Sequence, residues 1–150
     1  FLMLDGITDV RNFGAIVRSA ECMGVDAVII PVKGMAPINA DAVKSSSGAL
    51  LRVPICRSNH LDKTLLFLRN SGIKVVGCTE KSTENIDEVS LVEPLCIVMG
   101  NEETGLTEKT IQTADHLVRI PMIGDVASLN VSASCAVALY ETLRQRIKAQ

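Results

Sequence analysis

The segment Arg119–Glu141 reads RIPMIGDVASLNVSASCAVALYE, and along it the chain passes from a strand through a loop into a helix. Pro121 ends the apolar strand. Ser128 and Asn130 stand where the helix begins, and both are residue types that cap helices. From Ser132 to Ala138 the helix is rich in small residues. These residues allow close packing, either against the helix's own sheet or against a ligand or a second subunit.

The rest of the chain also alternates between short apolar runs and amphipathic stretches. Continuous apolar runs are typical of strands in a parallel sheet that is covered on both faces. The expected strands are Phe1–Leu4, Val25–Ile30, Leu51–Ile55, Ile73–Gly77, Leu95–Met99 and His116–Ile120. The expected helices are Asn12–Met23, Leu61–Asn70, Thr107–Ala114 and Val131–Ile147. This order predicts an α/β fold with a mostly parallel sheet and helices on both faces.

Composition excludes several classes of protein. The 150 residues are about one domain in size, and a hydrophobic content of 47% excludes a disordered chain. No apolar run reaches the roughly 18 residues of a membrane span, so we expect no membrane partner. The net charge of −2 excludes a highly basic nucleic-acid coat protein, and the aromatic content of 3% argues against a base-stacking platform.

The cysteines and histidines argue against disulfide and metal sites. The five cysteines are scattered and form no CxxC pair, which fits reduced core residues of a cytoplasmic protein. His60 and His116 have no cysteine or histidine close by in the sequence, so we expect no metal site.

Ligands of open α/β sheets bind beyond the carboxyl ends of the strands. This rule selects the loops after Leu4, Gly77, Met99 and Ile120. In LDGITDVRNFGAIVRSAE (residues 4–21), Asn12 is expected to open a helix as its N-cap. Gly14 costs helix stability and therefore indicates a close backbone approach. Arg18 lies among apolar neighbours, where it is either a functional residue or a snorkelling side chain.

Two further segments have polar and glycine-rich sequences. GNEETGL (residues 100–106) places glycines on either side of an acidic turn, which allows close approach of a ligand but also fits a plain turn. KSSSG (residues 44–48) is interpreted as a polar turn in preference to a phosphate-binding loop. Neither segment is a Walker or dinucleotide-binding motif.

Taken together, these segments resemble the motifs of the SpoU (also called TrmH) family of RNA 2'-O-ribose methyltransferases, in the SPOUT class. The family patterns are Asn-x-Gly-x-Ile-x-Arg, Gly-x-Glu-x-x-Gly and Ile-Pro-Met followed by Ser-Leu-Asn-Val. KSSSGALLR (residues 44–52) is also similar to the family's Ser-x-Gly-Ala segment. The matching residues are Asn12, Gly14, Ile16, Arg18, Gly100, Glu102, Gly105, Ile120, Pro121, Met122, Ser128, Leu129, Asn130 and Val131.

The resemblance implies a fold that periodicity alone would not propose. Members of this family form a deep trefoil knot at the C-terminus, and the knot builds the S-adenosylmethionine site. They form homodimers to which the last helix contributes. Residues 1–150 are thus expected to be the catalytic domain, with any N-terminal RNA-binding domain absent from this chain. The implied substrate is RNA, most similar to the guanosine targets of the bacterial 23S ribosomal RNA enzymes.

The resemblance also assigns site residues. The implied catalytic set is Asn12, Arg18, Glu102, Ser128 and Asn130. Arg18 would stabilise the forming alkoxide and grip an RNA phosphate, since a guanidinium barely deprotonates. Asn12, Ser128 and Asn130 would orient Arg18 or the ribose, and Glu102 would hold its loop or engage Arg18. The implied cofactor-binding set is Thr79, Met99, Gly100, Ile120, Met122, Ser128 and Leu129.

Alternative functions stay open at this point. The RNA target can be tRNA rather than ribosomal RNA. The same scaffold can also serve a non-catalytic RNA-binding or ribosome-assembly protein. A small-molecule-binding flavodoxin-like domain is a third hypothesis, but it gives no reason for the three motifs to occur together.

Overall fold

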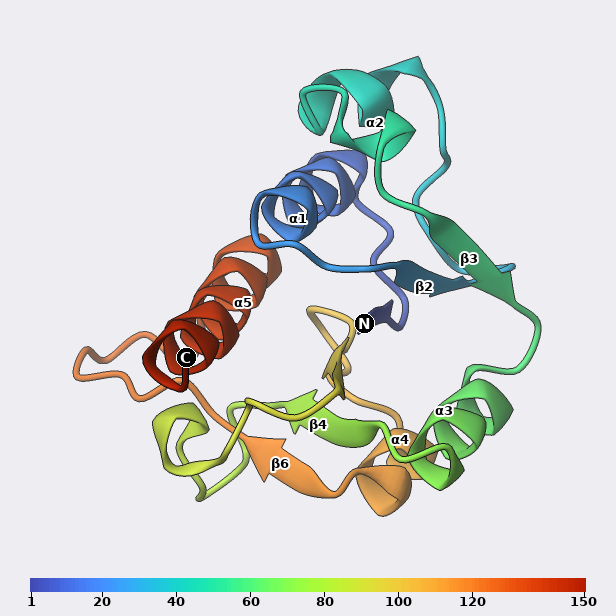
Figure 1. Ribbon diagram of the computed structural model, residues 1–150. Coiled ribbons are helices and arrows are strands. Elements are labelled where there is room, and N and C mark those ends of the chain that lie inside the picture. Colours follow the sequence, from blue (N-terminus) through green and yellow to red (C-terminus); the bar gives the residue numbers. More distant parts are fainter.

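The computed structural model describes residues 1–150 and contains one six-stranded sheet (Figure 1). The spatial order is β3-β2-β1-β5-β4-β6, and every neighbouring pair is parallel. The predicted α/β fold is confirmed, and the sheet is entirely rather than mostly parallel. The strands are β1 (Leu2–Leu4), β2 (Val28–Pro31), β3 (Ile55–Ser58), β4 (Lys74–Cys78), β5 (Leu95–Met99) and β6 (His116–Val118).

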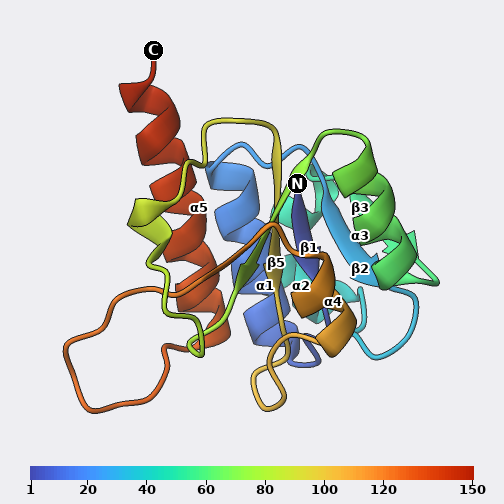
Figure 2. The same ribbon diagram turned by 90° about the horizontal axis from the view of Figure 1, so that it is seen from below.

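Helices cover both faces of the sheet, as predicted (Figures 1 and 2). On one face α1 (Val10–Cys22) packs against α5 (Val131–Lys148), and α2 (Ala40–Ser45) packs on α1. On the other face α3 (Leu61–Asn70) packs against α4 (Glu108–Thr113). Arg146 and Lys148 lie in the last turn of α5, where cations complement the helix dipole.

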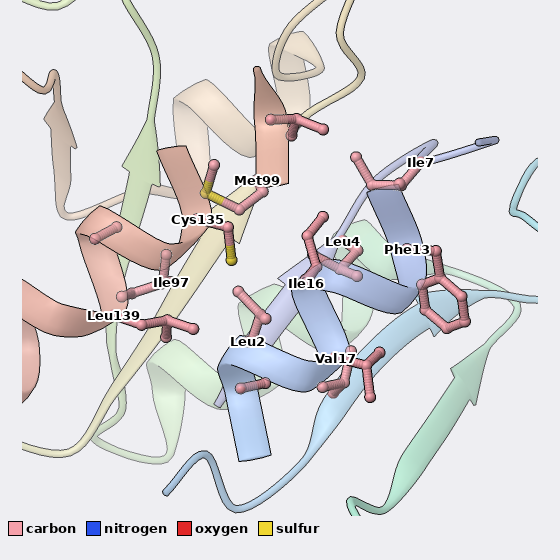
Figure 3. Packing of buried hydrophobic residues seen from close by; sticks show 14 of the residues in the cluster. Leu2, Leu4, Ile7, Phe13, Ile16, Val17, Ile97, Met99, Cys135 and Leu139 are labelled. Atoms are coloured by element: carbon pink, nitrogen blue, oxygen red, sulfur yellow. The ribbon is translucent and has the colours of Figure 1, made fainter. Parts of the chain in front are cut away.

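The core divides into two layers because side chains alternate along each strand. Leu2 and Leu4 of β1 join the larger cluster beneath α1 and α5, whereas Met3 faces the smaller cluster beneath α3. Figure 3 shows the larger layer, in which Ile16 and Val17 of α1 pack over these leucines. Burial on both faces explains why these strands are uniformly apolar.

Two expectations about local structure are wrong at one edge of the sheet. The strand expected at Leu51–Ile55 instead begins at Ile55, and Ala49–Leu51 forms a short 3-10 helix. β3 is an edge strand with two exposed residues, so an apolar run does not mark it. The short helix α2 was not expected, although Asn39 caps it by accepting a hydrogen bond from the Ala42 amide.

Gly14 is explained by the packing of α1 on α2. A Cβ at Gly14 would lie 2.7 Å from Ser45 Cβ and 2.9 Å from its backbone carbon, both inside normal van der Waals contact. The close backbone approach expected from the sequence is therefore confirmed. It brings the first turns of α1 against the end of α2.

All five cysteines are free, but they are not all core residues. Cys96 and Cys135 are buried, whereas Cys22 and Cys56 are exposed. The expectation of a core position is wrong for Cys22, which is exposed at the end of α1, and for Cys56, because the strand that carries it lies at the sheet edge. None of the helices has the length and apolar character needed to cross a membrane.

Candidate active site

A cavity of about 260 Å³ opens at the carboxyl ends of β4, β5 and β6. Its walls are four stretches of chain, residues 78–81, 99–105, 118–122 and 128–131, with Ser134 of α5 beside them. This is the edge of the sheet that sequence reasoning selected. The loop after β1 lies outside the lining, but Gly6 accepts a hydrogen bond of 2.8 Å from Asn101 Nδ2 at the cavity wall.

The structure brings the expected cofactor residues together. They come from three separate strand ends and from the loop before α5, and all of them line the cavity: Thr79, Met99, Gly100, Ile120, Met122, Ser128 and Leu129. Of the expected catalytic residues, Glu102, Ser128 and Asn130 line it too. Residues 121–130 are exposed along their whole length, and this loop extends away from the body of the molecule (Figure 2).

The loop after β5 is held in a closed turn. Asn101 exchanges two backbone hydrogen bonds with Gly105, of 3.1 and 2.9 Å. Its side-chain oxygen accepts from the amides of Glu103 and Thr104 at 2.8 and 3.1 Å. Because both backbone and side chain close the turn, the intervening Glu102 is carried on a fixed frame.

Glu102 joins the two neighbouring helices through two asparagines. Its Oε1 accepts from Asn12 Nδ2 at 3.0 Å and from Asn130 Nδ2 at 3.2 Å. Asn130 Nδ2 also donates to Asn12 Oδ1 at 3.0 Å. One residue from each of the three motifs thus meets its counterparts in a single network, which we call the Asn12–Glu102–Asn130 network.

The helix caps differ partly from expectation. Asp9, not Asn12, caps α1, and its carboxylate accepts from the Asn12 amide at 2.8 Å. The side chain of Asn12 is thereby left free for the network. Asn130 caps α5 as expected by accepting from the amides of Ser132 and Ala133. Ser128 precedes the cap by two residues and lines the cavity instead.

Gly100 allows close backbone packing within its own loop. A Cβ there would lie 2.6 Å from Leu106 N and still closer to the backbone of Gly105. The expected need for close approach is correct, but the approaching atoms belong to the protein and not to a ligand. Of KSSSG, which was predicted to be a polar turn, Lys44 and Ser45 end α2, and Ser46–Gly48 form a turn with Ser47 and Gly48 in the left-handed region. Ser46 Oγ donates to Val43 O at 2.9 Å within that turn.

Arg18 is not part of the cavity wall. It is exposed on α1 and makes no hydrogen bond or ion pair. Glu102 accepts hydrogen bonds from the two asparagines and makes none with Arg18 of the same chain. Within one chain, Arg18 therefore stands apart from the residues with which the motifs associate it.

Sequence reasoning missed several charged residues of the wall, namely Glu80, Lys81, Glu103 and Arg119. Their positions in the sequence could have indicated them, since they lie within three residues of a strand end or between the two motif glycines. Arg119 is held by Asn85, whose Oδ1 accepts from Arg119 Nε at 3.0 Å. Cys78 also lines the cavity, and burial raises the pKa of its thiol to about 12, so it stays protonated.

The lining combines two kinds of side chain. Met99, Ile120, Met122 and Leu129 are apolar, and Glu80, Lys81, Glu102, Glu103 and Arg119 are charged. S-adenosylmethionine has a matching division, with a flat adenine at one end and an amino acid with amine and carboxylate at the other. The residues present thus fit this cofactor. No group of three or more His, Cys, Asp or Glu side chains is placed to hold a metal ion.

Comparisons with known proteins agree with this geometry. The profile described as the SpoU rRNA Methylase family matches residues 1–140. The 23S rRNA (guanosine-2'-O-)-methyltransferase RlmB of Vibrio parahaemolyticus is 43% identical over 149 residues, which are 99% of this chain and 60% of that relative. The chain therefore spans about 60% of the length of such curated relatives.

Solved structures share the fold. The A. aeolicus TrmH/SpoU tRNA modifying enzyme has a TM-score of 0.90 and 32% identity, over 99% of this chain and 76% of that one. The SpoU methyltransferase AviRb from Streptomyces viridochromogenes, solved in complex with AdoMet, has a TM-score of 0.87 and 30% identity. That match covers 97% of this chain and 57% of AviRb.

Proposed function

The chain belongs to the SpoU rRNA methylase family, and from this membership we propose that it transfers a methyl group from S-adenosylmethionine to a ribose 2'-hydroxyl of RNA. The observation that carries the proposal is the Asn12–Glu102–Asn130 network, because it brings all three motifs to the mouth of one cavity. The proposed substrate is a guanosine in ribosomal RNA, the substrate class named for the 43% identical relative. Such a substrate places the activity in the cytoplasm.

In the proposed site, the apolar and the polar side chains of the cavity lining have different roles. When bound, S-adenosylmethionine supplies a methyl group that its positive sulfur makes open to displacement. Met99, Ile120, Met122 and Leu129 would hold the adenine, and Thr79, Gly100 and Ser128 complete the wall around it. The network would orient the ribose, because displacement needs the 2'-oxygen in line with the methyl group at about 3–3.5 Å.

Arg18 is proposed to stabilise the negative charge that develops on the 2'-oxygen and to grip an RNA phosphate through its planar fork. Because Arg18 does not line the cavity, we expect bound RNA, or a second copy of the chain, to bring Arg18 and the reacting group together. Its exposure and its lack of protein partners support this role, since the guanidinium is free to bind an anion.

The test of this role is single-turnover methylation of ribosomal RNA by Arg18→Ala at saturating cofactor. Loss of one such donor typically lowers the rate by about 10²–10³-fold, and cofactor affinity should not change. Arg18→Lys should rescue only in part, because a point charge does not replace a bidentate fork. A near-normal rate in Arg18→Ala would leave this residue a snorkelling side chain.

The target and the activity itself are tested separately. Transfer of tritiated methyl from the cofactor should label ribosomal RNA and not tRNA. Labelling of tRNA instead would favour the class named for the A. aeolicus structure. Cofactor binding by calorimetry without transfer to any RNA would favour a non-catalytic RNA-binding protein on this scaffold.

A homodimer through α5 is also proposed. Val137 and Tyr140 of this helix are 40% and 56% exposed, and Ser132 and Ala136 lie along the same stretch. Large exposed apolar side chains beside small ones suit close packing of two helices. Sedimentation should give twice the chain mass of 16.1 kDa, and a monomer at micromolar concentration would refute the dimer.

The C-terminal trefoil knot remains part of the proposal. The segment between β4 and β5 contacts the chain on both sides of the exposed loop, which supports a threaded arrangement. The amide of Ile86 donates to Arg119 O at 2.9 Å, and Gln145 of α5 bonds Leu91 N at 2.8 Å. Stretching single molecules by their termini should leave a knotted chain shorter than 150 extended residues would be.

A further inference from the structure

The two oxygens of the Glu102 carboxylate are used differently. Oε1 accepts from both asparagines of the network, at 3.0 and 3.2 Å. Oε2 accepts no hydrogen bond from any protein group, although the residue is exposed at the cavity wall. A carboxylate oxygen is purely an acceptor. Glu102 therefore presents one fixed and one unoccupied acceptor to the site.

The orientation of this carboxylate follows from the helix cap. Backbone amides can only donate, so the Asn130 oxygen must face Ser132 and Ala133, and its Nδ2 must face outward. Asn130 Nδ2 then donates to Asn12 Oδ1, which turns Asn12 Nδ2 toward Glu102. Both amide groups thus direct hydrogens at Oε1, and the unoccupied acceptor is Oε2.

No other carboxylate of the cavity is held in this way. The charged groups that share the walls are Glu80, Lys81, Glu103 and Arg119. The side chains of Glu80 and Glu103 make no hydrogen bond, and Lys81 and Arg119 offer only donors. Glu102 is the one carboxylate in the cavity lining that is held by hydrogen bonds to other side chains, and a preorganised position is what proton transfer requires.

We infer that Glu102 Oε2 is the acceptor of the ribose 2'-hydroxyl proton, an inference that rests on the proposed methyl transfer. The 2'-oxygen bonds to the methyl carbon, and the bonding pair of the broken carbon–sulfur bond stays on sulfur. The hydroxyl proton passes to Oε2, which leaves a neutral carboxyl group and a neutral thioether. Arg18 keeps its role as a cation near the developing charge.

Glu102→Gln is the informative variant because it has the same shape. Its side-chain oxygen can still accept from Asn12 and Asn130, while an amide nitrogen replaces Oε2. Single-turnover methylation should fall by roughly 10²–10⁴-fold, the usual share of a general base. Glu108→Gln, an exposed position on α4 outside the cavity, is the matched control.

A binding measurement separates proton acceptance from positioning without any chemistry. The probes are ribosomal RNA fragments with hydroxyl or fluorine at the target 2' position, bound in the presence of S-adenosylhomocysteine. A hydroxyl can donate to Oε2 and fluorine cannot, so the wild type should prefer the hydroxyl by roughly 10- to 100-fold. The amide of Glu102→Gln can donate to either group, so the preference should disappear.

The results distinguish a failure of the proposed function from a failure of the inference about Glu102. If the wild type transfers no methyl group to RNA, the proposed function fails. If it does transfer and Glu102→Gln keeps its rate, the inference about Glu102 is overturned while the function stands. An unchanged hydroxyl preference in Glu102→Gln would overturn the inference as well, because a positioning role alone predicts it.

Discussion

Replacing Gly14 by alanine tests the packing that joins the first motif to the rest of the fold. Two effects oppose each other. Alanine favours a helix over glycine by about 1 kcal/mol. Against this, the new Cβ would lie 2.7 Å from Ser45 Cβ and 2.9 Å from the Ser45 backbone carbon. The backbone contact cannot be relieved by a side-chain rotation, so α2 must move away from α1.

The steric cost should win. Overpacking a close-packed site costs about 1–3 kcal/mol, and Gly14 is fully surrounded where the helices cross. After the gain in helix propensity we expect a net loss of up to about 2 kcal/mol. With a urea slope of about 2 kcal/mol/M, the midpoint of unfolding should fall by up to about 1 M.

The assay is urea unfolding followed by circular dichroism, with Gly124→Ala as the control. Gly124 has no atom within 4 Å of an added Cβ, so its variant should keep the parent midpoint. Adding Ser45→Gly to Gly14→Ala removes the nearest side-chain atoms and should recover part of the loss, as a positive coupling in a double-mutant cycle. If Gly14→Ala proves as stable as the parent, the close approach of α1 and α2 is wrong.

The structure also predicts the effects of two other substitutions, one on cofactor binding and one on stability. Gly100→Val should weaken cofactor binding in calorimetry because its side chain would collide with the Gly105 backbone and open the loop, and unchanged affinity would refute this account of the loop. Burial raises the pKa of Asp5, opposed by a hydrogen bond from Thr107, so the folded state binds this proton more tightly than the unfolded chain. Stability from this group is thus present at low pH and lost as pH rises through the raised pKa. Asp5→Asn should therefore raise the urea midpoint at pH 7 but not near pH 3.5, and equal shifts at both would contradict the assignment.

The sequence predicts best those elements that are buried on both sides. β5 begins and ends at the residues expected from its apolar run, Leu95–Met99, because every one of its side chains is buried. β3 escapes the same reasoning because Cys56 and Arg57 at the sheet edge face solvent. The pattern of apolar residues indicates which residues are buried and not which strands pair. It therefore cannot predict a strand that is hydrogen-bonded in the sheet but exposed to solvent.

Helix ends were predicted less well than helices. Asn39 before α2 and Asp9 before α1 are both good capping residues, and both precede the helices they cap. The sequence predicts Asn12 as the cap because asparagine is a capping residue type at the expected start of the helix. Residue type alone does not separate a cap from a residue in the first turn, where the same side chain is free to bond elsewhere. The side chain of Asn12 is free in this way, and in the site it donates a hydrogen bond to Glu102.

The order of the strands in the sheet and the position of Arg18 outside the cavity lining could not be predicted from the sequence. Spacing places Arg18 one and a half turns after Asn12, which says that the two lie on one helix but not which faces they occupy relative to a partner. The helix turns by about 100° per residue, so six residues carry Arg18 well away from the direction of Asn12. Asn12 and Arg18 thus belong to one sequence motif, but the cavity lining includes only some of the motif residues, and Arg18 is not among them.

Residue 130 shows why the site and the fold require the same side chain. Asn130 accepts from two amides at the start of α5 and donates toward Asn12 and Glu102. Aspartate would cap the helix equally well, yet it would set a second acceptor 3.2 Å from Glu102 Oε1 where a donor now stands. Serine would also cap, but its single hydroxyl cannot serve the amides of α5 and also reach Glu102. Asparagine has both an acceptor and two donors on one short side chain, so the cap that starts α5 also sets which oxygen of Glu102 is left for a ligand.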